Sequence, residues 1–146
     1  TGDKGYIDKD GFLHITGRIK DIFKTSKGKY IEPGILESNF DSVSFFHQMC
    51  IVGVGLDQPL LLAVPSPEAQ KNKDFVVSKL SEMLEKVNYN LDGYKKIKKI
   101  IFVKDEWTSE NGLVTPTLKI KRSKIDEKFS PKYNDWEKSI ESVVWE

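Results

Sequence analysis

Alternating apolar and polar positions near the start of the chain predict two short β-hairpins. Residues 6–16 (YIDKDGFLHIT) contain two such runs on either side of Asp10-Gly11, and Asp-Gly is a strong signal for a hairpin turn. Residues 22–31 form a second candidate hairpin, whose tip lies near Lys27-Gly28. Residues 17–21 (GRIKD) between them are mostly polar. We therefore expect a charged joint between two antiparallel strand pairs.

The middle of the chain alternates between predicted helices and strands. Residues 33–40 suit a short helix, because proline is favoured in a first helical turn. Residues 45–56 are apolar and rich in β-branched side chains, which indicates a buried strand, and residues 60–64 return as a second strand. Ser66-Pro67 predicts the start of a longer helix with a serine cap. Apolar residues then recur on one helical face, namely Val76, Leu80, Met83, Leu84, Val87 and Leu91.

The last third of the chain predicts one more strand, a long loop and a final helix. Residues 97–103 read as the third strand, and residues 107–116 as a polar loop. Ser130-Pro131 opens the final helix, whose apolar stripe would be Tyr133, Trp136, Ile140, Val143 and Val144. The fold class predicted from this order is α+β, with a β-hairpin and a roughly three-stranded sheet packed with helices.

Composition narrows the class of protein. The chain has 146 residues, 38% hydrophobic and 31% charged, which is typical of a soluble globular domain. A net charge of +1 gives no overall attraction to nucleic acid or membranes. The single cysteine, Cys50, excludes an internal disulfide, and its apolar surroundings predict a buried, unreactive thiol in a reducing compartment. The longest apolar runs are far shorter than the roughly 20 residues of a membrane span. The start TGDKG lacks a methionine, so we expect a piece of a longer protein.

Two motifs near the start could bind a nucleotide. In Thr1-Gly2-Asp3 a carboxylate follows a glycine, and such a carboxylate can accept hydrogen bonds from the two hydroxyls of a ribose. Taken alone, the tripeptide favours a plain turn over a ribose-binding site, because Gly-Asp turns are common. In residues 17–21 the planar fork of Arg18 suits ribose oxygens or phosphate. The alternative is an exposed joint in which Arg18 pairs with Asp21.

Two further motifs carry lysines. In residues 26–30 (SKGKY) Gly28 allows close approach of the backbone to another group, supplies the positive φ of a hairpin tip, or does both. Residues 116–122 (PTLKIKR) would put Lys119 and Lys121 on one face if the segment is extended, and a basic surface patch is the alternative. The long loop before them favours a functional placement, because structureless loops of this length are usually functional or disordered.

The order and spacing of these motifs are more specific than any single one. TGD, GRIKD, KGKYIEPGILE, a core strand, YKKIKKIIFV and ENGLVTPTLKIKR follow one another along the whole chain. This pattern resembles the C-terminal part of the adenylate-forming enzymes, a superfamily that includes acyl-CoA synthetases, luciferases and nonribosomal peptide adenylation domains. The closing motif is most similar to that of long-chain fatty acid CoA ligases. The segment between Val64 and Tyr94 is shorter than in many long-chain enzymes, so the acyl chain length stays open.

The resemblance implies a domain division and a reaction. Residues 1–19 would be the last hairpin of a large N-terminal domain, and residues 20–146 a small mobile C-terminal lid. The parent would be a cytoplasmic acid–thiol ligase, at most peripheral to a membrane, that converts a fatty acid and ATP to acyl-AMP and then to acyl-CoA. ATP, Mg²⁺ and CoA would bind mainly with the N-terminal domain, and we expect no metal ligands in this chain. The isolated chain would be monomeric and inactive, and would not bind nucleic acid.

The resemblance also implies roles for individual residues. Lys119 would be the catalytic cation, Asp3 and Arg18 would hold the ribose, and Lys20 would be the hinge. The wall of the CoA channel would be formed by Lys27, Gly28, Lys29 and Tyr30.

Two other functions compete with this interpretation. The parent could be a fatty acyl-AMP ligase or an adenylation domain that delivers the acyl group to a carrier-protein thiol. Alternatively, residues 95–99 and 119–124 could be the lysine-rich surfaces of a non-enzymatic module that grips nucleic acid or acidic lipid. The near-neutral net charge argues against the second alternative, because such binding needs several clustered cationic contacts. His14 and His47 have no predicted role.

Overall fold

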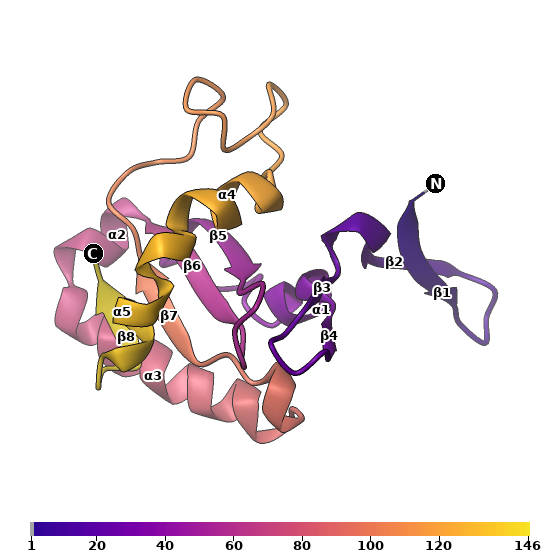
Figure 1. The fold of residues 1–146 in the computed structure, drawn as a ribbon, viewed down its shortest axis with the longest axis horizontal. Coiled ribbons are helices and arrows are strands. Elements are labelled where there is room, and N and C mark those ends of the chain that lie inside the picture. Colours follow the sequence, from indigo (N-terminus) through magenta and orange to yellow (C-terminus); the bar gives the residue numbers. More distant parts are fainter. Residues whose placement is uncertain (1) are drawn as a thin grey trace.

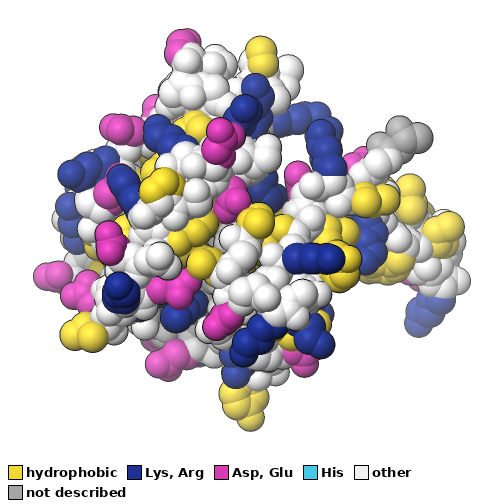
Figure 2. Space-filling view, viewed as in Figure 1, with side chains coloured by type: hydrophobic (Ala, Val, Ile, Leu, Met, Phe, Trp, Pro, Cys, Tyr) yellow, Lys and Arg dark blue, Asp and Glu magenta, His cyan; other side chains and the backbone are white. Residues whose placement is uncertain are grey.

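A computed structural model describes residues 2–146, and its first element is an antiparallel hairpin. β1 (Asp3–Ile7) pairs with β2 (Leu13–Arg18), so the hairpin predicted around Asp10-Gly11 is confirmed. Figure 1 shows that it projects from one side of the body, to which Lys4 connects it through an ion pair with Glu32. Its apolar side chains face water, as the hydrophobic atoms at the right of Figure 2 show. They are Tyr6, Ile7, Phe12, Leu13 and Ile15, each more than half exposed.

The predicted joint and second hairpin are also present. A 3₁₀ turn, Ile19–Asp21, follows β2 and leads into β3 (Phe23–Lys24), which pairs with β4 (Tyr30–Ile31). α1 (Pro33–Ser38) comes directly after, with its proline in the first turn. The first third of the chain therefore follows its local turn signals closely.

A four-stranded mixed sheet forms the centre of the body (Figure 1). β5 (Phe46–Val52) and β6 (Leu60–Pro65) are antiparallel, and β7 (Lys99–Phe102) lies parallel to β6. β6 and β7 are buried along their whole length, as expected of strands covered on both faces. The fourth strand, β8 (Val143–Trp145), is parallel to β7 and adds to the roughly three strands that the sequence predicts.

The C-terminal segment differs from its prediction. The expected helix is a 3₁₀ turn, Ser130–Lys132, followed by the short α5 (Tyr133–Lys138). The chain becomes extended at Ser139, so Ile140 is fully exposed and Val143 reaches the sheet. Two neighbouring β-branched residues fit a pleated edge better than a helix, and this preference, together with pairing to β7, overrides the helical spacing. α4 (Arg122–Phe129), which the sequence does not predict, precedes this segment.

The predicted long helix is divided in two. Ser66 caps α2 (Pro67–Lys71) as expected, because its hydroxyl accepts a hydrogen bond of 3.2 Å from the Ala69 N–H. The backbone leaves the helical region at Asn72, and α3 (Lys73–Tyr89) begins after it. The predicted apolar face of α3 is buried at Val76, Leu80 and Leu84.

The core lies on both faces of the sheet. Alternate residues of a strand point to opposite faces, so Ile51 joins one cluster while Cys50 and Val52 join the other. α1 and α3 cover the first face, and α4 and α5 cover the second, together with Trp107. The loop between β7 and α4 is therefore held on the second face, and it projects at the top of Figure 1. No helix within residues 2–146 combines the length and apolar character needed to cross a bilayer.

Candidate functional site

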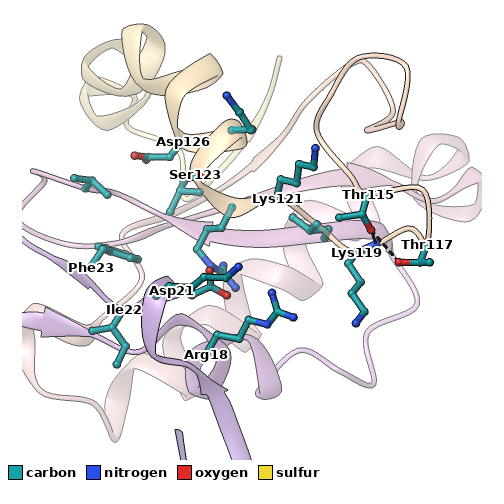
Figure 3. Close-up of a pocket in the computed structure, with 16 residues that line it drawn as sticks. Arg18, Asp21, Ile22, Phe23, Thr115, Thr117, Lys119, Lys121, Ser123 and Asp126 are labelled. Atoms are coloured by element: carbon teal, nitrogen blue, oxygen red, sulfur yellow. Dashed lines mark hydrogen bonds between the residues drawn. The ribbon is translucent and has the colours of Figure 1, made fainter. Parts of the chain in front are cut away.

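A cleft of about 810 Å³ separates the joint after β2 from the loop before α4. Figure 3 shows the residues that line it. Its charged lining is mostly cationic and comes from both sides, namely Arg18, Lys20, Lys119, Lys121, Arg122 and Lys124, with Asp21 and Asp126 as the acidic members. Concave surfaces with one predominant sign of charge concentrate ligands of the opposite sign. The cleft is therefore suited to an anionic ligand such as a phosphate or a carboxylate.

A tight turn, residues 115–119, holds Lys119 at this cleft. The Thr115 N–H donates to the Lys119 carbonyl (2.8 Å) and the Leu118 N–H donates to the Thr115 carbonyl (2.8 Å). The Thr115 hydroxyl accepts from the Lys119 N–H at 3.0 Å. A single bridge between Val114 and Ile120 closes the turn, so the segment is not the extended run considered from the sequence. Lys119 and Lys121 nevertheless both line the cleft.

Arg18 reaches the same cleft from the hairpin side. Figure 3 shows Arg18 and Lys119 extending into a common space from different elements. Asp3 lies opposite Arg18 in the β1–β2 register, and 3.8 Å separates its Oδ1 from Arg18 Nε. The Arg18–Asp21 pair considered from the sequence is replaced by this contact. The structure thus brings together the two predicted ribose-binding residues; Thr1 of the same motif lies outside the described residues.

Lys20 sits in the 3₁₀ turn between the hairpin and the body. Its side chain is exposed and lines the cleft beside Arg18. This turn is the covalent connection between the apolar hairpin and the rest of the chain. A rotation of one part against the other would need to change backbone angles at such a short connection.

The remaining predicted residues lie at a different groove. Gly28, Lys29 and Tyr30 line a groove of about 460 Å³ with residues of α1 and of the segment after α3, whereas Lys27 is not part of its lining. Gly28 has a φ of +78°, so the turn reading of this glycine is correct. A Cβ at Gly28 would meet no atom within 4 Å of this chain. Arg18, Lys20 and Lys119 therefore line one surface, and Gly28, Lys29 and Tyr30 line another, while Asp3 and Lys27 are in neither lining.

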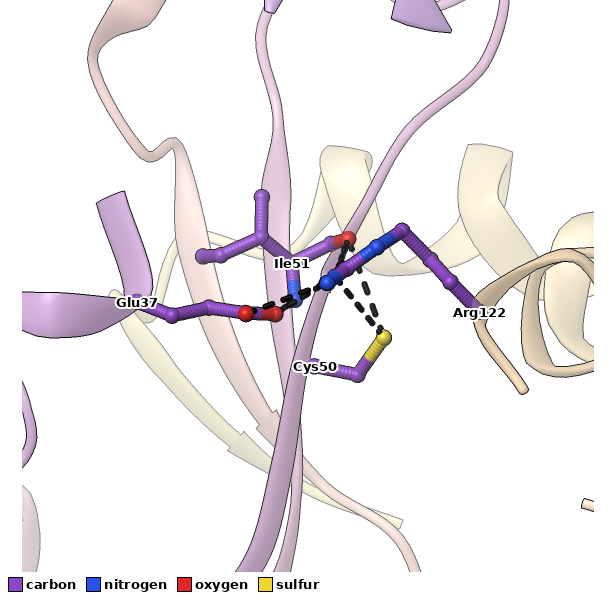
Figure 4. A network of polar contacts seen from close by, with 4 residues as sticks. All are labelled: Glu37, Cys50, Ile51 and Arg122. Atoms are coloured by element: carbon purple, nitrogen blue, oxygen red, sulfur yellow. Dashed lines mark hydrogen bonds and ion pairs between the residues drawn. The ribbon is translucent and has the colours of Figure 1, made fainter. Parts of the chain in front are cut away.

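A partly buried polar network missed by the sequence analysis connects these two surfaces (Figure 4). Both terminal nitrogens of Arg122 donate to the carboxylate of Glu37, the second at 3.1 Å. Arg122 Nη1 also donates to the Ile51 carbonyl (2.9 Å), and the Ile51 N–H donates to Glu37 (2.8 Å). The pair joins α4, which follows the Lys119 turn, to α1, which follows the Gly28 turn. The only hint in the sequence is that Glu37 and Arg122 end two of the motifs.

Cys50 lies beside this network as a fully buried thiol, as predicted. Arg122 Nη1 is 3.2 Å from its sulfur. Burial raises the pKa of the Cys50 thiol to about 12, although the nearby Arg122 charge acts in the opposite direction. The thiolate is therefore disfavoured near neutral pH, and Cys50 packs as a small apolar side chain.

The charged side chains of the cleft suit an anionic group. Within residues 2–146, no three His, Cys, Asp or Glu side chains are grouped so that they could hold a metal. The cations of the cleft suit phosphate oxygens.

Comparison with known proteins gives a consistent family. The model of the AMP-binding enzyme C-terminal domain matches residues 20–140. The long-chain-fatty-acid–CoA ligase FadD15 of Mycobacterium tuberculosis is 30% identical over 89% of this chain and 25% of its own length. Long-chain-fatty-acid–CoA ligase 5 of Rattus norvegicus is 30% identical over 97% of this chain and 23% of its own length.

A solved structure agrees with these sequence relatives. The A domain of carboxylic acid reductase from Segniliparus rugosus, in complex with AMP and a co-purified carboxylic acid, superimposes with a TM-score of 0.73 at 25% identity. The match covers 93% of this chain and 22% of that one. The chain thus spans about a quarter of the length of the curated relatives it matches. By its sequence and its fold, the chain belongs to the family of AMP-binding enzyme C-terminal domains.

Proposed function

We propose that this chain is the mobile lid of an AMP-forming long-chain fatty acid–CoA ligase. The observation that carries the proposal is the cationic cleft, in which the Lys119 turn faces Arg18 and Lys20. The family match and the names of the sequence relatives support the reaction class. The substrates are a fatty acid, ATP and CoA, and the partner of the lid is a large N-terminal domain of the same protein.

In the first half-reaction a carboxylate attacks the α-phosphorus of ATP and pyrophosphate leaves. Two anions approach each other, so a positive charge is needed where negative charge develops. Lys119 supplies this charge between the carboxylate and the α-phosphate. The turn that holds its backbone limits reorganisation during the reaction. Asp3 accepts hydrogen bonds from the ribose hydroxyls, and Arg18 donates to the ribose or the phosphate. Asp3 and Arg18 lie side by side, so both can reach the same nucleotide.

In the second half-reaction the thiol of CoA attacks the acyl carbon and AMP leaves. A lysine over the phosphate would obstruct the thiol, so Lys119 has to withdraw. Rotation of the lid about Lys20 moves Lys119 away from the phosphate and brings the Lys27–Tyr30 turn to the acyl-adenylate. The location of Gly28 and Tyr30 at a second groove supports this proposal. The absence of a side chain at Gly28 leaves room for the pantetheine arm.

The domain division follows the same logic. The exposed apolar side chains of the β1–β2 hairpin suit a surface that is covered by protein, because large exposed apolar patches usually mark interfaces. The family match begins at residue 20, directly after the hairpin. Residues 1–19 therefore belong with the large domain, and residues 20–146 form the lid.

The contacts of residues 95–99 argue against one of the two lysine-rich surfaces of the non-enzymatic alternative. Residues 95–99 do not form a free cationic strip, because Lys99 is buried and donates to the Glu141 carbonyl (2.6 Å). Lys98 is paired with Glu137 at 3.2 Å. Lys98 and Lys99 would therefore have to leave these partners before they could bind an anionic polymer or membrane.

The test uses the full-length protein and a matched pair of variants. Lys119→Ala should abolish acyl-AMP formation, measured as pyrophosphate release, and should spare thioester formation from supplied acyl-AMP. Lys121→Ala removes the same charge from the same cleft and should reduce the first step far less. An equal loss of acyl-AMP formation in the two variants would show that Lys119 acts only through its contribution to the overall charge of the cleft. That result would contradict its proposed role. Thioester formation with free CoA supports the ligase, whereas transfer only to a carrier protein supports the alternative.

A further inference from the structure

Two five-residue turns of this chain share one backbone design. In residues 25–29 the Thr25 N–H donates to the Lys29 carbonyl (2.8 Å) and the Gly28 N–H donates to the Thr25 carbonyl (3.0 Å). The Lys29 N–H donates to the Thr25 hydroxyl at 3.2 Å. These are the same three contacts that define the Lys119 turn. Each turn begins with threonine, ends with lysine and has a fourth residue with positive φ.

The fourth residue is where the two turns differ. Gly28 adopts its φ of 78° without steric penalty, whereas Leu118 adopts a φ of 66°. Among the residues that the structure describes, Leu118 is the only one other than glycine with a positive φ. Its side chain gains little in return within this chain, because it is 74% exposed. A leucine thus occupies a position at which glycine would suit the backbone better, and its removal would cost this domain little packing.

The position of Leu118 identifies where its side chain can be buried. It directly precedes Lys119, so its side chain moves with the lysine when this turn approaches another surface. Thr115, Thr117 and Lys119 line the cationic cleft, and Leu118 is not among the lining residues. Its side chain is therefore available to protein that closes over the rim of the cleft rather than to the ligand inside it.

We propose that Leu118 packs against an apolar surface of the large domain when Lys119 enters the nucleotide site. This inference rests on the proposed function. The contact holds the lysine in place and keeps water away from its ammonium, and both effects strengthen its interaction with the developing negative charge. When the lid turns to present Gly28, Leu118 returns to solvent. The leucine therefore favours the lid position of the first half-reaction over that of the second.

The experiment compares substitutions at residue 118 in the full-length protein. Leu118→Asn keeps the size of the side chain, tolerates positive φ and removes its apolar character. Leu118→Gly relaxes the backbone and removes the side chain. Both should slow acyl-AMP formation at saturating substrates at least tenfold, and thioester formation from supplied acyl-AMP should stay within twofold. Leu118→Met should retain the first step within threefold. Ile140→Asn is the control, because Ile140 has the same size as leucine and is fully exposed. This substitution should change the rate of neither step.

Two results would overturn the inference. One is acyl-AMP formation within threefold of the unaltered protein in Leu118→Asn or Leu118→Gly. The other is an equal loss in both half-reactions, which would indicate a general effect on folding. Neither result would affect the proposed function as long as Lys119→Ala still blocks the first step selectively. If Lys119→Ala instead retained acyl-AMP formation, that result would contradict the proposed function itself.

Discussion

The buried pair between Arg122 and Glu37 makes a quantitative prediction about stability. The side chains are only 15% and 19% exposed, so each charge depends on the other for compensation. Glu37→Ala would leave the guanidinium largely desolvated without its carboxylate and would also remove the acceptor of the Ile51 N–H. Breaking a buried pair on one side costs about 3–5 kcal/mol. A domain of this size has a total stability of about 5–15 kcal/mol, so this loss is a large fraction of it.

The same reasoning predicts that the two substitutions are not additive. Arg122→Met should cost a similar amount, because Glu37 keeps only the Ile51 N–H as its partner in the network. In the double variant Glu37→Leu/Arg122→Met both charges are absent and apolar side chains fill the space. Its stability should lie within about 1–2 kcal/mol of the unaltered chain, since apolar replacements of buried ion pairs are often tolerated.

Urea unfolding of the 146-residue chain, followed by circular dichroism, measures these differences as a double-mutant cycle. Thermal unfolding should show the single variants melting about 6–20 °C lower, because each kcal/mol lowers the melting temperature by about 2–4 °C. Single substitutions that cost less than about 1 kcal/mol would show that solvent already compensates both charges. A double variant that simply adds the two losses would show that the residues do not act as a unit.

Three further predictions concern local features of the fold. Cys50 should resist alkylation by iodoacetamide at pH 8 in the folded chain, because burial raises the pKa of its thiol to about 12. It should react once urea unfolds the chain. Rapid labelling of the folded chain would refute this prediction. Ser66→Ala should lower the free energy of unfolding by about 1 kcal/mol, because the α2 cap is lost. Ser109→Ala, in a loop, is the control. Equal losses for the two variants in urea titrations would refute the capping role. Gly28→Leu should cost about 1–2 kcal/mol by the same measurement, because its φ is positive, and no loss would show that the turn relaxes freely.

Local signals predicted the parts of the fold that short-range chemistry determines. Asp10-Gly11, Pro33 and Ser66 mark a hairpin and two helix starts, and each lies where its turn or cap preference places it. The edge strand β8 was missed because Val143 and Val144 also fit a helical spacing, and only pairing with β7 decides between the two. α4 was missed because its first turn is basic and lacks a side-chain cap, so no start signal is present.

The candidate site was predictable in its residues but not in its arrangement. Arg18 and Lys119 stand out through ordered motifs, and the structure places both at one cleft. The separation of Gly28 from this cleft, and the contact of Asp3 with Arg18, depend on how distant segments pack. The Glu37–Arg122 pair spans 85 positions in sequence, so neither partner indicates the other locally.

The central claim is that one lid presents two surfaces to the same active site, one for each half-reaction. The most direct measurement is a comparison of both half-reactions in full-length Gly28→Leu and Lys119→Ala, after confirming that each variant is folded. The account predicts opposite defects: Gly28→Leu should form acyl-AMP and fail in thioester formation, and Lys119→Ala should do the reverse. Parallel losses of both steps in both variants would contradict it.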